Sequence, residues 1–188
     1  MPRRPLSILA AAAAAAAVAL PALLAPAHAH AAGCVLNIGS CLVVTPPPAS
    51  LNLGQVNAAT TTTSAEQVMQ VAAGNSWGMR ISVDQAGGRM REHNGTSYVA
   101  SGKVMHHPLQ WRLSSFDGTA QSTSFADLST TPAVALTNRS ITGCVLLLLL
   151  CTDIPLGFRF RMTTSFWDAN AGANNYRIQV TYDTQLGF

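Results

Sequence analysis

The chain has 188 residues, about one domain's worth, and an alanine-rich N-terminus inflates its hydrophobic content of 48%. The whole sequence contains 11 Lys and Arg against 8 Asp and Glu. Arg3 and Arg4 belong to the N-terminal leader, so the rest of the chain has nine basic and eight acidic residues, a net charge of +1. A near-neutral domain lacks the basic footprint of a nucleic-acid-binding protein and the polybasic patch that binds anionic lipid.

The leader has the three parts of a secretory signal peptide. A basic start is followed by an apolar run from Leu6 to Ala25, and A-x-A cleavage sites lie between Ala27 and Ala31. We predict a cleaved signal peptide over residues 1–31 and a single mature domain over residues 32–188. The mature chain would have no transmembrane span and would be secreted or held at a bacterial cell surface.

Two other interpretations of the leader remain open. The apolar run is long enough to serve as a retained membrane anchor. Ala31-Ala32-Gly33-Cys34 is similar to a bacterial lipobox, in which the cysteine is lipidated and becomes the first mature residue. The prolines and the small residues at the end of the run favour cleavage over an anchor.

The mature chain contains many short segments with the composition of β-strands. In chain order they are 34–44, 51–54, 66–72, 76–85, 98–105, 109–113, 133–136, 141–151, 158–162 and 176–183. Turn signals separate them, and the Thr- and Ser-rich stretches 58–64 and 119–131 are predicted loops or weak edges. Because no stretch has a sustained helical period, we predict an all-β, antiparallel β-sandwich of immunoglobulin-like or jelly-roll-like type.

Strict alternation of apolar and polar residues indicates which side chains form the predicted core of the sandwich. Trp77 and Met79 alternate with Gly78 and Arg80 in the clearest strand, and successive side chains of a strand point to opposite faces. The same pattern recurs in 158–162 and 176–183 and around the second tryptophan. The residues expected to form the motifs and the core are Trp77, Met79, Trp111, Tyr176 and Tyr182.

Four cysteines are candidates for disulfide bonds: Cys34, Cys41, Cys144 and Cys151. An even number in an exported chain indicates two disulfides, and two C-x6-C spacings do not suit zinc. If 141–151 is one extended strand, antiparallel pairing with the N-terminal strand would join Cys34 to Cys151 and Cys41 to Cys144. Local pairing within each C-x6-C segment is the alternative.

Residues that could act in catalysis or bind a metal are few and are spread along the chain. H-E-x-x-H is absent, and the adjacent His106 and His107 would point to opposite faces of a strand, so His93 and this pair do not predict a metal site. The stretch from Asp168 to Asn174 has the alternating oxygens of a calcium loop without its acidic ligands, which favours a surface turn. We predict no cofactor, and Trp167 is a candidate exposed contact residue.

Three stretches resemble motifs of the WxL family of bacterial surface proteins. Residues 51–54 are similar to an early strand ending in glycine, and 74–79 to the first Trp motif, with Met79 at the leucine position. Residues 176–184 are similar to the closing strand, with Tyr182 at the position of the second Trp. The resemblance covers residues 51–184 and implies an exported β-rich domain that associates with the cell wall. Spore-coat-type and pilin-like sandwiches share similar openings.

These observations favour a non-catalytic module with a structural, cell-wall-associated or adhesive role. Its expected partners are a cell-wall glycan or other envelope proteins, and not nucleic acid. Two alternatives belong to other classes: a secreted carbohydrate-active hydrolase whose site is assembled from dispersed carboxylates, and a subunit of a coat or pilus that polymerises by strand exchange.

Overall fold

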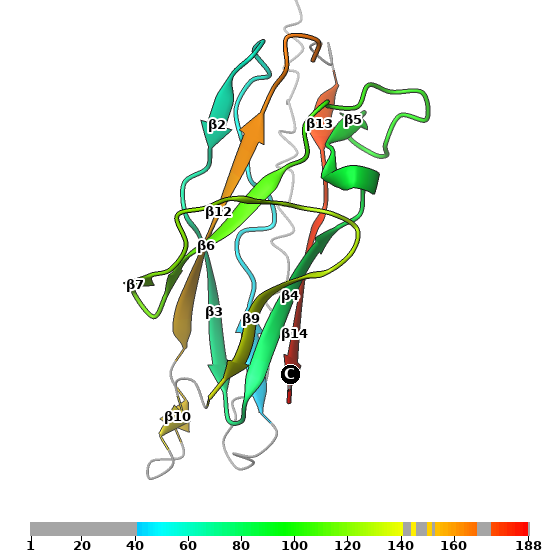
Figure 1. Ribbon diagram of the computed structural model, residues 1–188. Helices are drawn as coiled ribbons and strands as arrows, with labels where there is room; N and C mark the ends of the chain where they lie inside the picture. The colour runs from blue at the N-terminus through cyan, green and yellow to red at the C-terminus, as the bar shows by residue number, and fades with distance from the viewer. Residues whose placement is uncertain (1–40, 141–143, 146–149, 152, 169–173, 188) are drawn as a thin grey trace, which may run out of the picture.

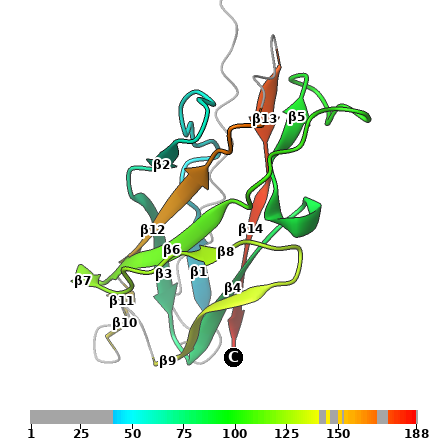
Figure 2. The same cartoon turned by 45° about the horizontal axis from the view of Figure 1, so that its top comes forward.

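A computed structural model describes residues 41–140, 144–145, 150–151, 153–168 and 174–187 (Figure 1). Apart from the short 3-10 turn η1 (Ala86–Gly88), its regular elements are all strands, and every pairing between them is antiparallel. The predicted all-β sandwich is therefore confirmed. Two sheets form its layers, and there are two further two-stranded pairs (Figure 2).

The larger sheet has seven strands. Its order is β1 (Leu42–Thr45), β3 (Gln67–Ala73), β12 (Ile154–Thr163), β6 (Gln110–Phe116) and β7 (Thr119–Ala120), with β2 (Thr61–Thr63) on β12 and β8 (Ala126–Asp127) on β6. The smaller sheet has the order β14 (Val180–Leu186), β4 (Trp77–Val83) and β9 (Ala133–Arg139). The two-stranded pairs are β13 (Asn175–Arg177) with β5 (Arg91–His93), and β10 (Cys144–Val145) with β11 (Leu150–Cys151).

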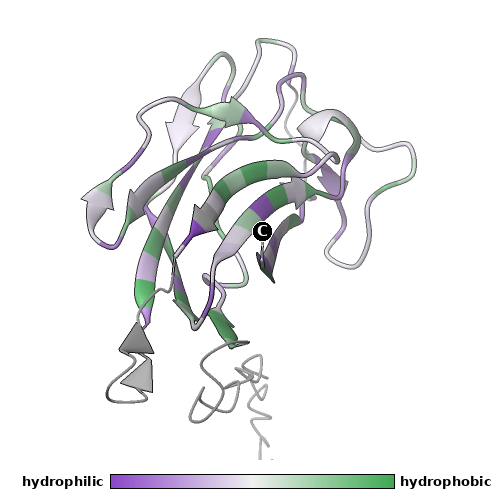
Figure 3. Cartoon of the chain, turned by 60° about the horizontal axis from the view of Figure 1, so that its bottom comes forward, coloured by the Kyte–Doolittle hydropathy of each residue, from purple (hydrophilic) through white to green (hydrophobic). Residues whose placement is uncertain are grey.

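The core fills the space between the two sheets. Figure 3 shows hydrophobic and hydrophilic positions alternating along the strands, as a sheet with one dry face requires. Trp77 and Met79 of β4 and Phe158 of β12 are fully buried. The ring of Phe158 lies 5.3 Å from that of Tyr182 on β14, so aromatic contacts join the larger sheet to the smaller one.

Two predicted strands are absent from the described residues, because local hydrogen bonds compete with strand pairing there. In 51–54 the side chain of Asn52 accepts a hydrogen bond from the Gly54 amide at 2.8 Å, which closes a turn. In 98–105 the Gly102 amide donates to the Val99 carbonyl oxygen at 3.0 Å, and only isolated bridges to 91 and 93 remain. The predicted strand over 176–183 is divided between β13 and β14, which pair with different partners.

The single extended strand expected over 141–151 is wrong. Its two described ends, β10 and β11, pair with each other, and Cys144 lies directly opposite Cys151. The N-terminal strand β1 pairs instead with β3, with Leu42 opposite Ala73. Cys41, just before β1, is disulfide-bonded. Among the described residues, the N-terminal strand therefore does not pair with the leucine-rich segment, and the hypothesis of cross-strand disulfides depended on that pairing.

We expect non-reducing peptide mapping to recover two separately looped tryptic peptides. Directly opposite residues of an antiparallel pair have Cα atoms about 4.5–5.5 Å apart, which is within reach of a disulfide. Trypsin leaves Cys34 and Cys41 on one peptide, and Cys144 and Cys151 on another. Recovery of both peptides as one linked species would contradict local pairing, and reduction before digestion is the control.

Candidate binding surface

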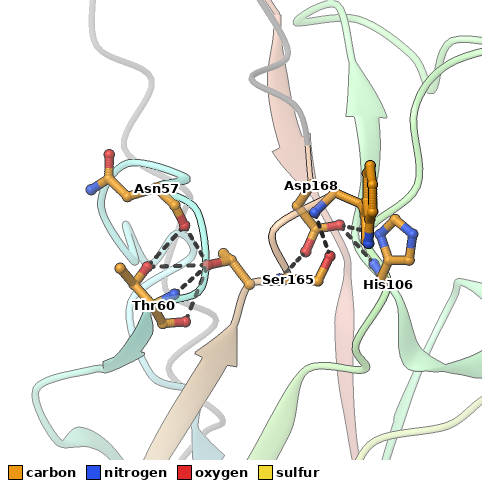
Figure 4. Close-up of polar contacts among 7 residues, drawn as sticks. Asn57, Thr60, His106, Ser165 and Asp168 are labelled. Atoms are coloured by element: carbon orange, nitrogen blue, oxygen red, sulfur yellow. Dashed lines mark hydrogen bonds and ion pairs between the residues drawn. The ribbon is translucent and has the colours of Figure 1, made fainter.

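The segment that follows β12 is fixed at its first residue by a network of threonines (Figure 4). Thr164 is 2% exposed, and its amide donates to the Thr60 carbonyl oxygen at 2.8 Å. Its hydroxyl accepts from the Thr60 amide at 2.9 Å and donates to the Asn57 carbonyl oxygen. These bonds tie the end of β12 to the 57–60 loop, more than 100 residues away in sequence.

A buried carboxylate fixes the other end of the same segment. The side chain of Asp168 is fully buried and accepts from the Ser165 amide at 2.6 Å. Its other oxygen accepts from the His106 amide at 2.9 Å and lies 2.7 Å from His106 Nδ1. Because a carboxylate can only accept, Nδ1 carries the hydrogen of this bond. Figure 4 shows Ser165 and His106 on either side of the carboxylate.

Between these two anchors the chain presents two aromatic side chains to solvent. Phe166 is 73% exposed and Trp167 is 76% exposed. Their rings meet edge to face, with centroids 5.5 Å apart and an interplanar angle of 90°. The Trp167 amide donates to the Ser165 hydroxyl at 3.0 Å, which adds a local constraint on the loop. We call Phe166 and Trp167 the aromatic platform.

The platform depends on the ionised form of Asp168. Burial alone would raise the pKa of this carboxyl, but the hydrogen bonds from the His106 side chain and from the Ser165 and His106 amides lower it below its ordinary value of 3.8. A lowered folded-state pKa means that Asp168 stabilises the fold above pH 3.8, and that this stabilisation is lost as the pH falls through the lowered pKa.

We expect Asp168→Asn to lower the free energy of unfolding at neutral pH by about 1–3 kcal/mol. The amide has one acceptor oxygen for three donors, so it leaves a buried donor unpaired. The two proteins should converge as the pH falls below 3.8 and through the lowered folded-state pKa, because folded wild-type Asp168 becomes protonated only at that point. Urea denaturation at neutral and acidic pH measures this. Asp183→Asn, which changes an exposed carboxylate on β14, is the control. The expectation would be contradicted if the difference in the free energy of unfolding between wild type and Asp168→Asn did not become smaller at acidic pH.

Three other carboxylates also accept hydrogen bonds that join separate segments. Asp84 accepts from the Tyr98 hydroxyl at 2.8 Å and the Gln179 amide at 2.9 Å. Burial together with the bond to Asp84 raises the pKa of Tyr98 to about 12. Glu92 accepts from Asn174 and from the Lys103 amide, and Glu66 from the hydroxyls of Ser114 and Ser115, with the pKa of each carboxyl lowered mainly by its first-named partner.

The motif and core residues predicted from the sequence lie in the sandwich and do not form a surface site. Trp77, Met79 and Trp111 are buried, whereas Tyr176 and Tyr182 are half-buried and pack against the core. Among the residues that the structure describes, no three His, Cys, Asp or Glu side chains gather as a metal site would require.

One stretch of the sequence matches the consensus of a hydrolase motif. Residues 74–78 read G-N-S-W-G, which matches the G-x-S-x-G nucleophile elbow. In that motif the serine lies on a turn from a strand into a helix, but here Ser76 leads from β3 into strand β4. Its amide is bonded to Asn75 Oδ1 at 2.7 Å, and no hydrogen bond in the described part of the chain joins its hydroxyl to a histidine. The local geometry is that of a connection between the two sheets.

Comparisons of the chain with protein-family models, with curated proteins and with solved structures found no match. In the described part of the chain, no helix has the length and hydrophobicity that crossing a membrane requires. The function is therefore inferred from the residues of this chain.

Proposed function

We propose that the protein is a non-catalytic, exported β-sandwich module that binds an uncharged cell-wall glycan through the aromatic platform. The observation that carries this proposal is the exposure of Phe166 and Trp167 on a segment that is anchored at both ends. Flat aromatic faces stack on the C–H faces of sugar rings. An uncharged polymer also fits the near-neutral charge of the domain.

The anchoring matters because binding is opposed by the ordering of mobile side chains. Each rotamer-rich side chain that is immobilised costs about 0.5–1.5 kcal/mol, and a rigid site avoids part of this cost. Thr164 and Asp168 already fix the backbone on both sides of the platform. The large and rigid ring of Trp167 also has few rotamers to lose, which is typical of aromatic anchors in binding surfaces.

The non-catalytic part of the proposal is supported by the roles of the carboxylates. Glu66, Asp84, Glu92 and Asp168 each accept bonds from groups that hold the fold together. The pKa of each carboxyl is lowered, which opposes service as the general acid of a glycosidase, for which a raised pKa is needed.

Co-sedimentation with insoluble, purified cell walls tests the binding proposal. Trp167→Ala should weaken binding at least about tenfold, as expected for a central tryptophan, and should change the free energy of unfolding by less than about 0.5 kcal/mol because the side chain is exposed. Val68→Ala is the matched control, because Val68 is a 40% exposed apolar residue on β3, away from the platform.

Equal binding by wild type and Trp167→Ala would overturn the assignment of the platform. Assay of the supernatant for released sugar separates a binding module from a hydrolase. Release that disappears when one of Glu66 or Asp84 is replaced by its amide would overturn the non-catalytic proposal.

A further inference from the structure

His106 lies next to the aromatic platform, and its ring is held in one orientation. The carboxylate that holds it belongs to Asp168, which directly follows Trp167 in the chain. The amide of His106 donates to Asp168 Oδ1 at 2.9 Å, and its ring nitrogen Nδ1 lies 2.7 Å from the same oxygen. Because these two bonds fix both the backbone and the ring, the imidazole has a defined position at the end of the platform segment (Figure 4).

The solvent-facing edge of this ring carries the second nitrogen, Nε2. The side chain of His106 is 52% exposed, whereas that of Asp168 is 0% exposed. Because Nδ1 faces the buried carboxylate, the part of the ring that meets solvent is the opposite edge, which contains Nε2. The described residues provide no hydrogen-bond partner for Nε2. A ligand on the platform therefore has access to this nitrogen.

The bond to Asp168 also determines what Nε2 can do. An ionised carboxylate only accepts, so Nδ1 carries the hydrogen of this bond, and in the neutral imidazole Nε2 then has a lone pair and no hydrogen. Nε2 is therefore a hydrogen-bond acceptor at a fixed position. An acceptor that is already oriented loses little side-chain freedom when a donor binds to it.

A fixed acceptor beside exposed aromatic rings restricts what the platform binds. Phe166 has no polar group, and the indole of Trp167 has only a donor, so the two rings alone would also suit an apolar ligand such as a lipid. A sugar has both a C–H face that stacks and hydroxyl groups that donate. We propose that His106 Nε2 accepts a hydrogen bond from a hydroxyl group of the glycan that stacks on the platform. This inference rests on the proposed function, and it names the residue that makes the site selective for hydroxyl-bearing rings.

The ¹⁵N signals of the histidine rings report directly on this nitrogen. In the full mature chain at mildly alkaline pH, a two-bond ¹H–¹⁵N spectrum should show His106 with a hydrogen on Nδ1 and none on Nε2. His106→Asn identifies its signals. Addition of a tetramer of N-acetylglucosamine, an uncharged sugar chain, should move the Nε2 signal of His106 in a saturable way. The signals of His93, which lies on β5, should stay in place.

His106→Asn also separates a binding role from a structural one. The side-chain amide nitrogen of asparagine takes the place of Nδ1 and can still donate to Asp168, but the edge with Nε2 is absent. This variant should keep the urea midpoint of wild type and weaken binding of the tetramer about three- to tenfold, the effect of one neutral hydrogen bond. His107→Asn, the same change at the adjacent exposed histidine, is the matched control and should alter neither.

A tetramer with O-methylated hydroxyl groups tests which group of the sugar donates the bond. Methylation keeps the C–H faces of the rings and removes every hydroxyl hydrogen. Wild type and His106→Asn should therefore bind the methylated tetramer with equal affinity, although they differ for the unmodified one.

Failure of this inference can be told apart from failure of the proposed function. If Trp167→Ala binds the tetramer as tightly as wild type does, the platform is not the binding site and both are overturned. If Trp167→Ala binds weakly while His106→Asn binds like wild type, the platform stands and the role of His106 is overturned. An Nε2 signal that does not move, or equal weakening by His106→Asn for both tetramers, would also overturn the role of His106.

Discussion

Replacing Trp77 with alanine is expected to lower the free energy of unfolding by about 3–5 kcal/mol, the range for truncation of a large aromatic residue in a core. Trp77 opens strand β4 and is 0% exposed. It lies opposite Leu186 of β14 on one side and Arg139 of β9 on the other. Both neighbours belong to the smaller sheet, so the cavity left by the indole would lie at the end of β4, the central strand of that sheet.

Chemical denaturation of the purified domain measures this loss. Trp167→Ala removes the same indole from a side chain that is 76% exposed, so it controls for the chemistry of the change and should cost less than about 0.5 kcal/mol. A loss of less than about 1 kcal/mol for Trp77→Ala would contradict the burial of this residue.

The alternation of apolar and polar residues predicted the strands whose faces differ most. Strand β4 was expected within 76–85, and it spans Trp77–Val83. Strand β12 was expected over 158–162 and is longer, Ile154–Thr163. These strands could be predicted because a period of two is a local property of the sequence, and burial on one face enforces it. The short strands β2, β7 and β8 lie in Thr- and Ser-rich stretches where no such pattern exists.

Strand partners could not be predicted, because pairing is a long-range property. The leucine-rich stretch shows this well. Its composition indicated one buried strand, yet Cys144–Val145 and Leu150–Cys151 pair with each other. Cross-strand disulfides were predicted from the length of one extended strand, and the segment does not form a single strand. Nothing local distinguishes an apolar strand from an apolar hairpin that lacks Gly, Asn or Pro.

Only part of the candidate site could be predicted from the sequence. The exposure of Trp167 could be predicted because it falls outside the alternation and precedes a predicted turn. The bond between Asp168 and His106 spans 62 residues, and the two residues carry no shared motif. Ser165 and Asp168 do have the spacing of a local turn, in which a carboxylate accepts from a nearby backbone amide. That spacing was the available signal for a fixed loop.

Of the adjacent glycines Gly87 and Gly88, Gly88 lies where three backbone segments approach one another closely. Gly88 ends η1 with φ of +66°, a conformation that residues with a side chain rarely adopt. Its carbonyl oxygen accepts from the Leu109 amide at 2.7 Å, and the Leu109 carbonyl oxygen accepts from the Leu128 amide at 2.9 Å. A Cβ atom on Gly88 would collide with the carbonyl group of Leu128. The close approach of these three backbones therefore requires a residue without a side chain.

We accordingly expect Gly88→Ala to lower the free energy of unfolding by about 2–5 kcal/mol, because left-handed backbone strain costs about 1–2 kcal/mol and overpacking against a rigid neighbour about 1–3 kcal/mol. The adjacent Gly87 is the matched control. Its φ is +65°, but the nearest atom to an added Cβ is Arg89 Nε at 3.7 Å, an ordinary contact. Gly87→Ala should therefore show the strain alone, about 1–2 kcal/mol. Denaturation of both variants separates strain from collision, and equal losses would show that Leu128 moves aside.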